Sequence, residues 1–284
     1  MHLRILSHTR YEYEKPASFS PHLVRLFPRQ ENFIRILETT FTTLENTVVN
    51  HRRDLFDNQI ARCFFPEKAS VLDFDVRLEL MLEERSAFDF LIDGHATRFP
   101  FTYRPAEKHV LAPYLVQPEN EKVDSANFWQ VEKDMPTLDA LLALNQTMFT
   151  NIGYERRDEG QAMLPSETLD RGIGACRDFS RLAASLLRSA GIAVRLVSGY
   201  VAEFGKSKED RRAEGSLHAW IEAYIPGAGW LGMDPTNGVL CDHHFIPTAV
   251  GLHPDDISPT AGSYYGKENI DSVLTSTITI DPVE

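Results

Sequence analysis

The strongest restriction on the fold comes from residues 216–234, where apolar and polar side chains alternate and the chain then reverses at a turn. Up to Ile225 every second residue is apolar, which is typical of a β-strand. Residues 226–229, with the sequence Pro-Gly-Ala-Gly, are a turn signal, and residues 230–234 read as a return strand that Pro235 ends. The segment therefore predicts two neighbouring antiparallel strands.

This hairpin carries His218 on its first strand and Asp234 at the end of its second. Because side chains alternate with a period of two, these residues share a face only if facing positions have numbers with an even sum. An even sum needs an odd number of loop residues or a bulge, as in a three-residue loop with glycine. Taken singly, His218 also fits an ordinary half-buried histidine, and Asp234 fits a turn residue before a proline.

Cys176 stands directly before an amphipathic helix that we expect over about residues 177–190, with Gly191 just beyond its end. Gly172 and Gly174 allow a sharp turn ahead of it. Free backbone N–H groups and the positive end of the helix dipole favour a thiolate here and can hold an oxyanion. The alternative interpretation of Cys176 is a small buried hydrophobic residue at a helix start.

Together these stretches supply a thiol, an imidazole and a carboxylate, the minimum set for a cysteine nucleophile activated by an oriented base. Residues 174–200, 217–222 and 226–238 resemble the bacterial transglutaminase-like superfamily. The resemblance implies a papain-like core. It also assigns Cys176 as the nucleophile, His218 as the general base and acid, and Asp234 as the orienting carboxylate.

The first part of the chain is similar to the β-rich N-terminal domain that precedes this core in many bacterial members, through residues 8–13 and 21–28. Residues 54–58 match the Asp-x-Phe-Gly-Asn motif of that domain, except that Asp57 stands in place of the glycine. Residues 252–256 depart from the Gly-Arg-Asp-Tyr that relatives often carry. These departures leave the three catalytic positions unchanged and bear on substrate details.

We therefore expect an α+β protein. Residues 1–115 form a β-rich, antiparallel sandwich-like domain, residues 116–135 a connector, and residues 136–284 a transglutaminase-like catalytic core, in which the helix bearing the cysteine packs on an antiparallel sheet. Alternation over residues 71–82 predicts a strand with one buried face. An apolar stripe over residues 138–152 predicts a helix, and residues 273–280 predict a late strand that returns to a sheet.

Charge and cysteine content narrow the functional classes. Acidic residues outnumber basic ones by 41 to 29, and the sequence has no basic run of the kind that binds a phosphate backbone. Nucleic acid is therefore not an expected partner. Three cysteines, at positions 63, 176 and 241, cannot all pair, which favours a reducing compartment. With no secretory h-region at the N-terminus and no long apolar run, we expect a cytoplasmic protein that does not bind membranes.

The expected activity is a thiol-dependent amide hydrolase or acyl transferase that acts on protein or peptide amides through a thioester. We favour hydrolysis, as a protease or deamidase, over cross-linking, because water is always present. The oxyanion should be held by the Cys176 N–H and a second donor, with Trp129, Asn145, Gln146 and Tyr154 as candidates. Oligomeric state stays open.

Two alternatives remain. The chain could be a catalytically silent binding module that retains the fold, or a redox or metal-binding protein using Cys176 with His218, although no Cys-x-x-Cys motif is present. Residues 241–244, Cys-Asp-His-His, lack the ligand spacing of structural zinc sites. We therefore expect neither a cofactor nor a metal. We expect residues 203–215 to form a charged loop, which is either a solvated surface loop or a flap at the edge of the cleft.

Overall fold

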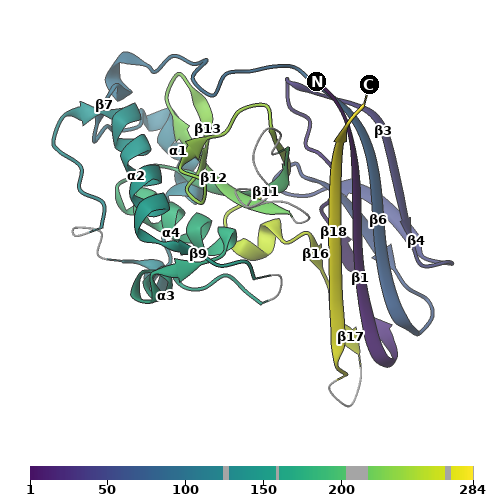
Figure 1. The fold of residues 1–284 in the computed structure, drawn as a ribbon. Helices are drawn as coiled ribbons and strands as arrows, with labels where there is room; N and C mark the ends of the chain where they lie inside the picture. Colours follow the sequence, from purple (N-terminus) through teal and green to yellow (C-terminus); the bar gives the residue numbers. More distant parts are fainter. Residues whose placement is uncertain (124–127, 158–159, 203–216, 266–269, 284) are drawn as a thin grey trace.

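The computed structural model describes residues 1–123, 128–157, 160–202, 217–265 and 270–283. Two lobes lie in contact: one consists of long strands, and in the other helices pack around a second sheet (Figure 1). The expected α+β class is confirmed. The charged loop over residues 203–215 lies outside the described residues.

The strand lobe is a sandwich of two antiparallel sheets (Figure 1). The larger sheet contains β18 (Ser272–Pro282), β1 (His2–Phe19), β6 (Ala69–Leu82) and β3 (Ile34–Thr43), with β17 (Tyr264–Tyr265) paired to the far end of β1. The smaller sheet has the order β16 (Thr260–Ala261), β2 (His22–Val24), β5 (Gln59–Phe64) and β4 (Val48–Arg53). The predicted strand over residues 71–82 is confirmed, since every second side chain of β6 from Leu72 to Leu82 is buried between the sheets.

The helical lobe is built on one antiparallel sheet with the order β14 (Val239–Leu240), β13 (Gly229–Asp234), β12 (His218–Ile225), β11 (Val194–Val201) and β15 (Phe245–Gly251). Its helices are α1 (Pro105–Leu115), α2 (Thr137–Asn151), α3 (Pro165–Arg171) and α4 (Cys176–Ser189). Short elements join them: η1 (Gly94–Ala96), β7 (Arg98–Phe99), η2 (Glu119–Glu121), β8 (Met135–Pro136), β9 (Gly153–Tyr154), β10 (Ile173–Gly174) and η4 (Pro254–Ile257).

Helix α4 packs on this sheet with the apolar stripe that the sequence predicted. Phe179, Leu182, Leu186 and Leu187 are buried in one cluster with side chains of β11, β12 and β13. The helix ends as expected at a glycine, because Gly191 has a φ of +81°, a value that residues with a side chain rarely adopt. The predicted helix that carries the cysteine and packs on an antiparallel sheet is therefore confirmed.

The two lobes share a continuous core and a polar clasp. Tyr200 and Ile246, from two strands of the helical lobe, are buried in the core of the sandwich. Asn58, which is fully buried, donates from Nδ2 to the Val250 carbonyl oxygen and accepts from the Val250 N–H, each at 2.8 Å. This side-chain amide thus pairs with β15 as a neighbouring strand would, and it fixes how the sandwich sits on the sheet of the helical lobe.

The structure divides the chain differently from the expected domains. β18 pairs with β1 along its whole length, so residues 272–282 complete the N-terminal sheet rather than the core that we expected over residues 136–284. Phe90, Ile92 and Phe99 pack into the helical lobe, although they fall within the expected domain of residues 1–115. Alternation showed that these segments form strands or loops, but pairing partners far away in the sequence decide to which lobe they belong.

Residues 116–135, expected as a connector, are packed on α4 where they are described. The Glu121 carboxylate, 4% exposed, accepts from Arg181 Nη2 at 2.7 Å, and Ser185 Oγ donates to the Glu121 carbonyl oxygen at 2.5 Å. Trp129 is buried in the main cluster of the lobe. The segment therefore contacts α4 through Glu121, while most of its other polar side chains, such as Asn120 and Lys133, are exposed. Among the described helices none has the length and apolar character needed to cross a membrane.

Candidate active site

Cys176 is the first residue of α4, and Asp178 holds this helix start in place. The Asp178 side chain is fully buried and accepts hydrogen bonds at 2.7 Å from the Ala175 and Met163 N–H groups. Arg157 Nη2 adds an ion pair at 2.9 Å. A Cβ at Gly174 would lie 2.9 Å from the Asp178 Cβ, so only glycine lets the chain approach so closely.

The hairpin has the register that the sequence argument required. Ile225 faces Gly229 and Ile221 faces Met233, so facing positions have an even sum and the loop between them holds three residues. His218 and Asp234 consequently lie on the same face of the sheet. This prediction is confirmed, and the His218 Nε2 atom lies 2.9 Å from Asp234 Oδ2.

Asp234 is fully buried, and every contact given for its carboxylate comes from a donor. Oδ1 accepts from the Thr236 N–H at 3.0 Å, and Oδ2 accepts from Asn237 Nδ2 at 2.6 Å as well as from the His218 ring. These donors stabilise the charged form, and together with the His218 charge they lower the pKa of Asp234 although burial opposes this. Asn237 was not among the predicted site residues; its place three positions after an aspartate is a turn signal that could have indicated it.

Helix α2 holds the loop that carries Asp234. Asn145 Nδ2 donates to the Val239 carbonyl oxygen at 2.8 Å. Gly238, with a φ of +70°, packs against Phe149 so closely that a Cβ would lie 3.1 Å from that side chain. Asn145, on the apolar stripe of the predicted helix, is therefore a buried amide that positions the loop.

The two ring nitrogens of His218 have different partners. Nε2 is committed to Asp234, so Nδ1 is the nitrogen left for proton exchange with the thiol. Nδ1 is buried and makes no well-aligned hydrogen bond among the described residues, yet the thiol and the ring lie close enough to stabilise each other's charged forms. The Trp220 ring lies beside the imidazole at an interplanar angle of 24°, with the ring centroids 6.4 Å apart.

Both reactive groups have shifted pKa values. Burial alone would lower the pKa of His218, but the Asp234 carboxylate and the Cys176 sulfur raise it to about 10. Burial alone would raise the pKa of Cys176, but the His218 charge and hydrogen bond, the Ala219 N–H and the Arg177 charge together lower it. Each charged form therefore stabilises the other, and both shifts favour the thiolate and the imidazolium as a pair.

Two concavities flank the sulfur. A pocket of about 190 Å³ is walled mainly by apolar residues, among them Ala162, Leu196 and Ile257, with Cys176 and His218 at its side. A groove of about 560 Å³ runs between the lobes, with Cys176, Tyr154 and Arg177 on one wall and residues of β1 and β18 on the other. Pro254 and Asp255, within the segment that departs from the family pattern, line the smaller pocket.

The structure narrows the candidates for the second oxyanion donor. Trp129 Nε1 donates to the Ala140 carbonyl oxygen at 3.2 Å, and Gln146 Nε2 donates to Thr150 Oγ1 at 3.1 Å. Asn145 is used in the Asp234 loop. Tyr154 is the one of the four that lines the groove beside Cys176, because β9 pairs in parallel with β10 directly ahead of the cysteine.

Other groups lie away from this centre. Burial raises the pKa of Cys63 to about 12 and that of Cys241 well above its ordinary value, so both thiols are poor nucleophiles. Asp242, His243 and His244 offer ligand atoms within 4.8 Å of one another and could hold a metal, but Cys241 is not part of that group.

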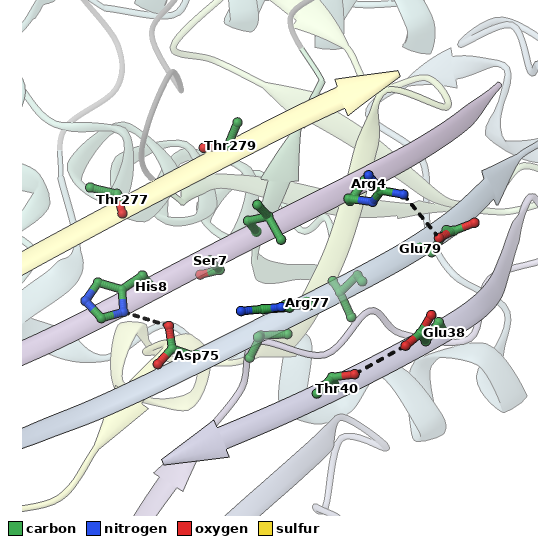
Figure 2. A pocket seen from close by; sticks show the side chains of 13 residues that line it. Arg4, Ser7, His8, Glu38, Thr40, Asp75, Arg77, Glu79, Thr277 and Thr279 are labelled. Carbon is green, nitrogen blue, oxygen red and sulfur yellow. Dashed lines mark hydrogen bonds and ion pairs between the residues drawn. The ribbon is translucent and has the colours of Figure 1, made fainter. Parts of the chain in front are cut away.

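Another concavity lies on the outer face of the larger sheet (Figure 2). It measures about 710 Å³, and its charged side chains pair across strands, as His8 does with Asp75 and Arg4 with Glu79. Figure 2 shows these pairs along β1 and β6, with Glu38 and Thr40 of β3 beside them. Such cross-strand pairs are typical of a solvated sheet face, and the residues that line it include no cysteine.

Two family models match the chain. Residues 126–235 match the transglutaminase-like superfamily core, and residues 3–81 match the bacterial transglutaminase-like N-terminal region. The uncharacterized protein ML0607 of Mycobacterium leprae is 26% identical over 98% of both chains. The chain spans about half the length, 49%, of uncharacterized relatives in other mycobacteria, which are 32% identical over 52% of this chain.

Two further proteins carry a functional description. A protein-glutamine gamma-glutamyltransferase of Pseudomonas aeruginosa is 36% identical over 24% of this chain and 10% of its own length. A crystal structure from Cytophaga hutchinsonii, described as a putative cysteine protease, superposes with a TM-score of 0.71 at 18% identity and covers 100% of this chain and 91% of its own. The second likeness concerns the fold. Together with the family models, these likenesses support a thiol-dependent enzyme in general terms.

Proposed function

Because the chain belongs to the transglutaminase-like superfamily, with the bacterial N-terminal region ahead of the core, we propose that it is an amide hydrolase that uses Cys176 as its nucleophile. The observation that carries the proposal is the buried contact between His218 Nε2 and Asp234, beside a thiol whose pKa is lowered. Protein or peptide amides are the proposed substrates, because the groove is about 560 Å³ in volume and runs between the two lobes.

In the first half of the reaction the Cys176 thiolate attacks the amide carbonyl carbon and forms an S–C bond. The carbonyl oxygen becomes an oxyanion, and we propose the Cys176 N–H and the Tyr154 hydroxyl as its donors because both residues line the groove. His218 Nδ1–H then gives its proton to the leaving nitrogen as the C–N bond breaks. The products are an amine and a thioester on Cys176.

In the second half water attacks the thioester carbonyl carbon, and His218 Nδ1 takes the proton from the water. The C–S bond breaks, the acid leaves, and the thiolate and the imidazolium are restored. Asp234 keeps the ring oriented and its charge balanced throughout. We favour water over an amine as acceptor because hydroxyl groups and arginines, which solvate readily, line the groove. The cytoplasmic location expected from the cysteine count stays a prediction.

The test is the pH dependence of iodoacetamide alkylation at Cys176, followed by mass spectrometry in the wild type and in His218→Ala. The buried, high-pKa thiols of Cys63 and Cys241 should remain unlabelled in the folded protein. We expect fast labelling at pH 6 in the wild type, and a shift of the profile toward that of free cysteine in the variant.

An alkylation profile that resembles free cysteine and does not respond to His218→Ala would instead favour the silent binding module. With an activated thiol established, three assays separate the acyl acceptors. Release of ammonia from glutamine peptides indicates a deamidase, new peptide termini indicate a protease, and incorporation of a labelled primary amine indicates cross-linking.

A further inference from the structure

Two strands form the open edges of the larger sheet, and they differ in regularity. Figure 2 shows the strand order β18, β1, β6, β3. Within the described residues β18 pairs only with β1, in an unbroken register from Leu3↔Pro282 to Tyr13↔Ser272. At the opposite edge, β3 carries a register shift between Ile36 and Glu38. A bulge of this kind hinders the addition of another strand, and β18 has none.

The two edges also differ in charge. β3 carries Arg35 and Glu38, whereas residues 272–280, with the sequence Ser-Val-Leu-Thr-Ser-Thr-Ile-Thr-Ile, include no charged residue. β-Branched residues dominate this stretch, and they favour an extended backbone. In an antiparallel pair every second residue directs its N–H and C=O away from its partner. β18 therefore presents a regular row of backbone donors and acceptors, which is a template for an added strand.

This edge lies at the groove that contains the nucleophile. Ser272, Leu274 and Ser276 of β18 line the groove of about 560 Å³ together with Cys176. Figure 1 places β18 as the strand of its sheet that lies nearest to the helical lobe. An extended chain laid along β18 would consequently lie beside the groove that holds Cys176.

We propose that β18 binds an extended segment of the substrate polypeptide as an additional strand, which presents an amide of that segment to Cys176. This inference rests on the proposed function and adds the substrate class: unfolded or extended polypeptide, recognised through its backbone with broad tolerance of side chains. The shared groove favours substrate over a second copy of the chain, since β18 pairing with another β18 would occupy the same edge and give the nucleophile no role.

The test uses acetyl-tetra-alanyl chloromethyl ketone, in which the Cys176 thiolate displaces chloride, and four versions that each carry one N-methylated alanine. Second-order rates of Cys176 labelling are compared with those of acetyl chloromethyl ketone and of iodoacetamide. We expect the tetra-alanyl chain to accelerate labelling. N-methylation should slow labelling about tenfold at alternate positions and hardly at the others, because a strand directs every second N–H toward its neighbour.

A matched pair of variants tests whether β18 is the strand that binds the probe. Ser276→Lys, on the groove side of β18, should lower the ratio of the tetra-alanyl rate to the iodoacetamide rate at least fivefold. Thr39→Lys, an exposed position on the opposite edge strand β3, should change neither rate.

No acceleration by the peptide chain, or equal slowing at all four positions, would overturn the proposal. So would a wild-type dimer in sedimentation velocity that Ser276→Lys dissociates while N-methylation has no alternating effect; the edge would then belong to a second copy. The ratios between probes can be measured even with an ordinary thiol. Slow iodoacetamide labelling would therefore count against the activated nucleophile and not against the strand-adding edge.

Discussion

At the scale of single residues, His218 divides its two ring nitrogens between a carboxylate and a thiol. Nε2 faces Asp234, the reverse of the serine-protease arrangement in which Nδ1 faces the aspartate. The swapped roles of the two nitrogens follow from the position of the partners. His218 and Asp234 share a face of one hairpin, and Cys176 comes from a helix packed beside that hairpin. The ring direction is thus set by which element supplies each partner.

Replacing Asp234 by Asn should weaken the ion pair without emptying the site. The carboxylate charge is what raises the pKa of His218 against burial, so in Asp234→Asn the pKa of His218 should fall and that of Cys176 should rise. Each unit of pKa corresponds to about tenfold in thiolate at acidic pH, so iodoacetamide labelling at pH 6 should slow about tenfold or more. Wild-type labelling in this variant would show that Asp234 does not tune the pair.

The pH profile of amide hydrolysis should be a broad bell. Below the lowered pKa of Cys176 the thiolate is protonated, and activity falls on the acid side. His218 holds its proton until the pH reaches about 10, and above this the leaving nitrogen loses its proton donor, so activity falls again. Initial rates from pH 4 to 11 give both limbs. An alkaline limb near pH 7 would contradict the raised pKa.

The same shifts make a contribution to stability with a definite sign. A histidine whose folded pKa lies above its unfolded value near 6.5 stabilises the fold fully below that pH, and the contribution is lost as the pH rises through about 10. Asp234, whose pKa is lowered, stabilises above its unfolded value and loses that contribution as the pH falls. The ion pair between His218 and Asp234 therefore stabilises the folded state in the pH range in which both groups are charged.

At the scale of elements, the start of α4 depends on one buried carboxylate. Asp178 accepts the Ala175 and Met163 N–H groups and pairs with Arg157, so it fixes the turn that places Cys176. Asp178→Asn removes the charge and leaves one of these donors poorly paired, and we expect it to lower the free energy of unfolding by about 2–3 kcal/mol. Urea denaturation followed by circular dichroism measures this.

The matched control for that change is Asp170→Asn, an exposed aspartate on the neighbouring helix α3, which should change stability by less than about 0.5 kcal/mol. Equal effects of the two substitutions would mean that the helix start does not rest on the Asp178 contacts.

At the scale of the whole molecule, Asn58 joins the lobes. Its side-chain amide pairs with the N–H and the C=O of Val250, and its Oδ1 also accepts a hydrogen bond from Arg29. Asn58→Ala would leave these groups unpaired in a buried place, at a cost of about 2–4 kcal/mol. Because the proposed substrate groove lies between the lobes, labelling by the tetra-alanyl probe should slow while iodoacetamide labelling changes less.

Asn120→Ala, at an exposed asparagine, is the control and should leave stability and both labelling rates unchanged. If Asn58→Ala unfolds with the wild-type midpoint in urea, the clasp contributes nothing to the docking of the lobes.

The sequence alone determined the local elements and one non-local relation. The period of the alternation and the glycines predicted the strand over residues 71–82, the helix over about residues 177–190 and the strand over residues 273–280, because periodicity and turn chemistry are properties of neighbouring residues. The hairpin pattern set the condition for His218 and Asp234 to share a face, an odd number of loop residues, and the structure meets it with three.

Only the tertiary structure decided which partners those elements take. Nothing within residues 272–282 says that they pair with β1, and nothing within residues 116–135 says that Glu121 is buried against Arg181. Asp178, Asn145 and Asn58 read as ordinary polar residues until their distant backbone partners are placed beside them. Such roles depend on packing between segments far apart in the chain, and that packing is what turns a reactive thiol into a site with a groove and an open strand edge.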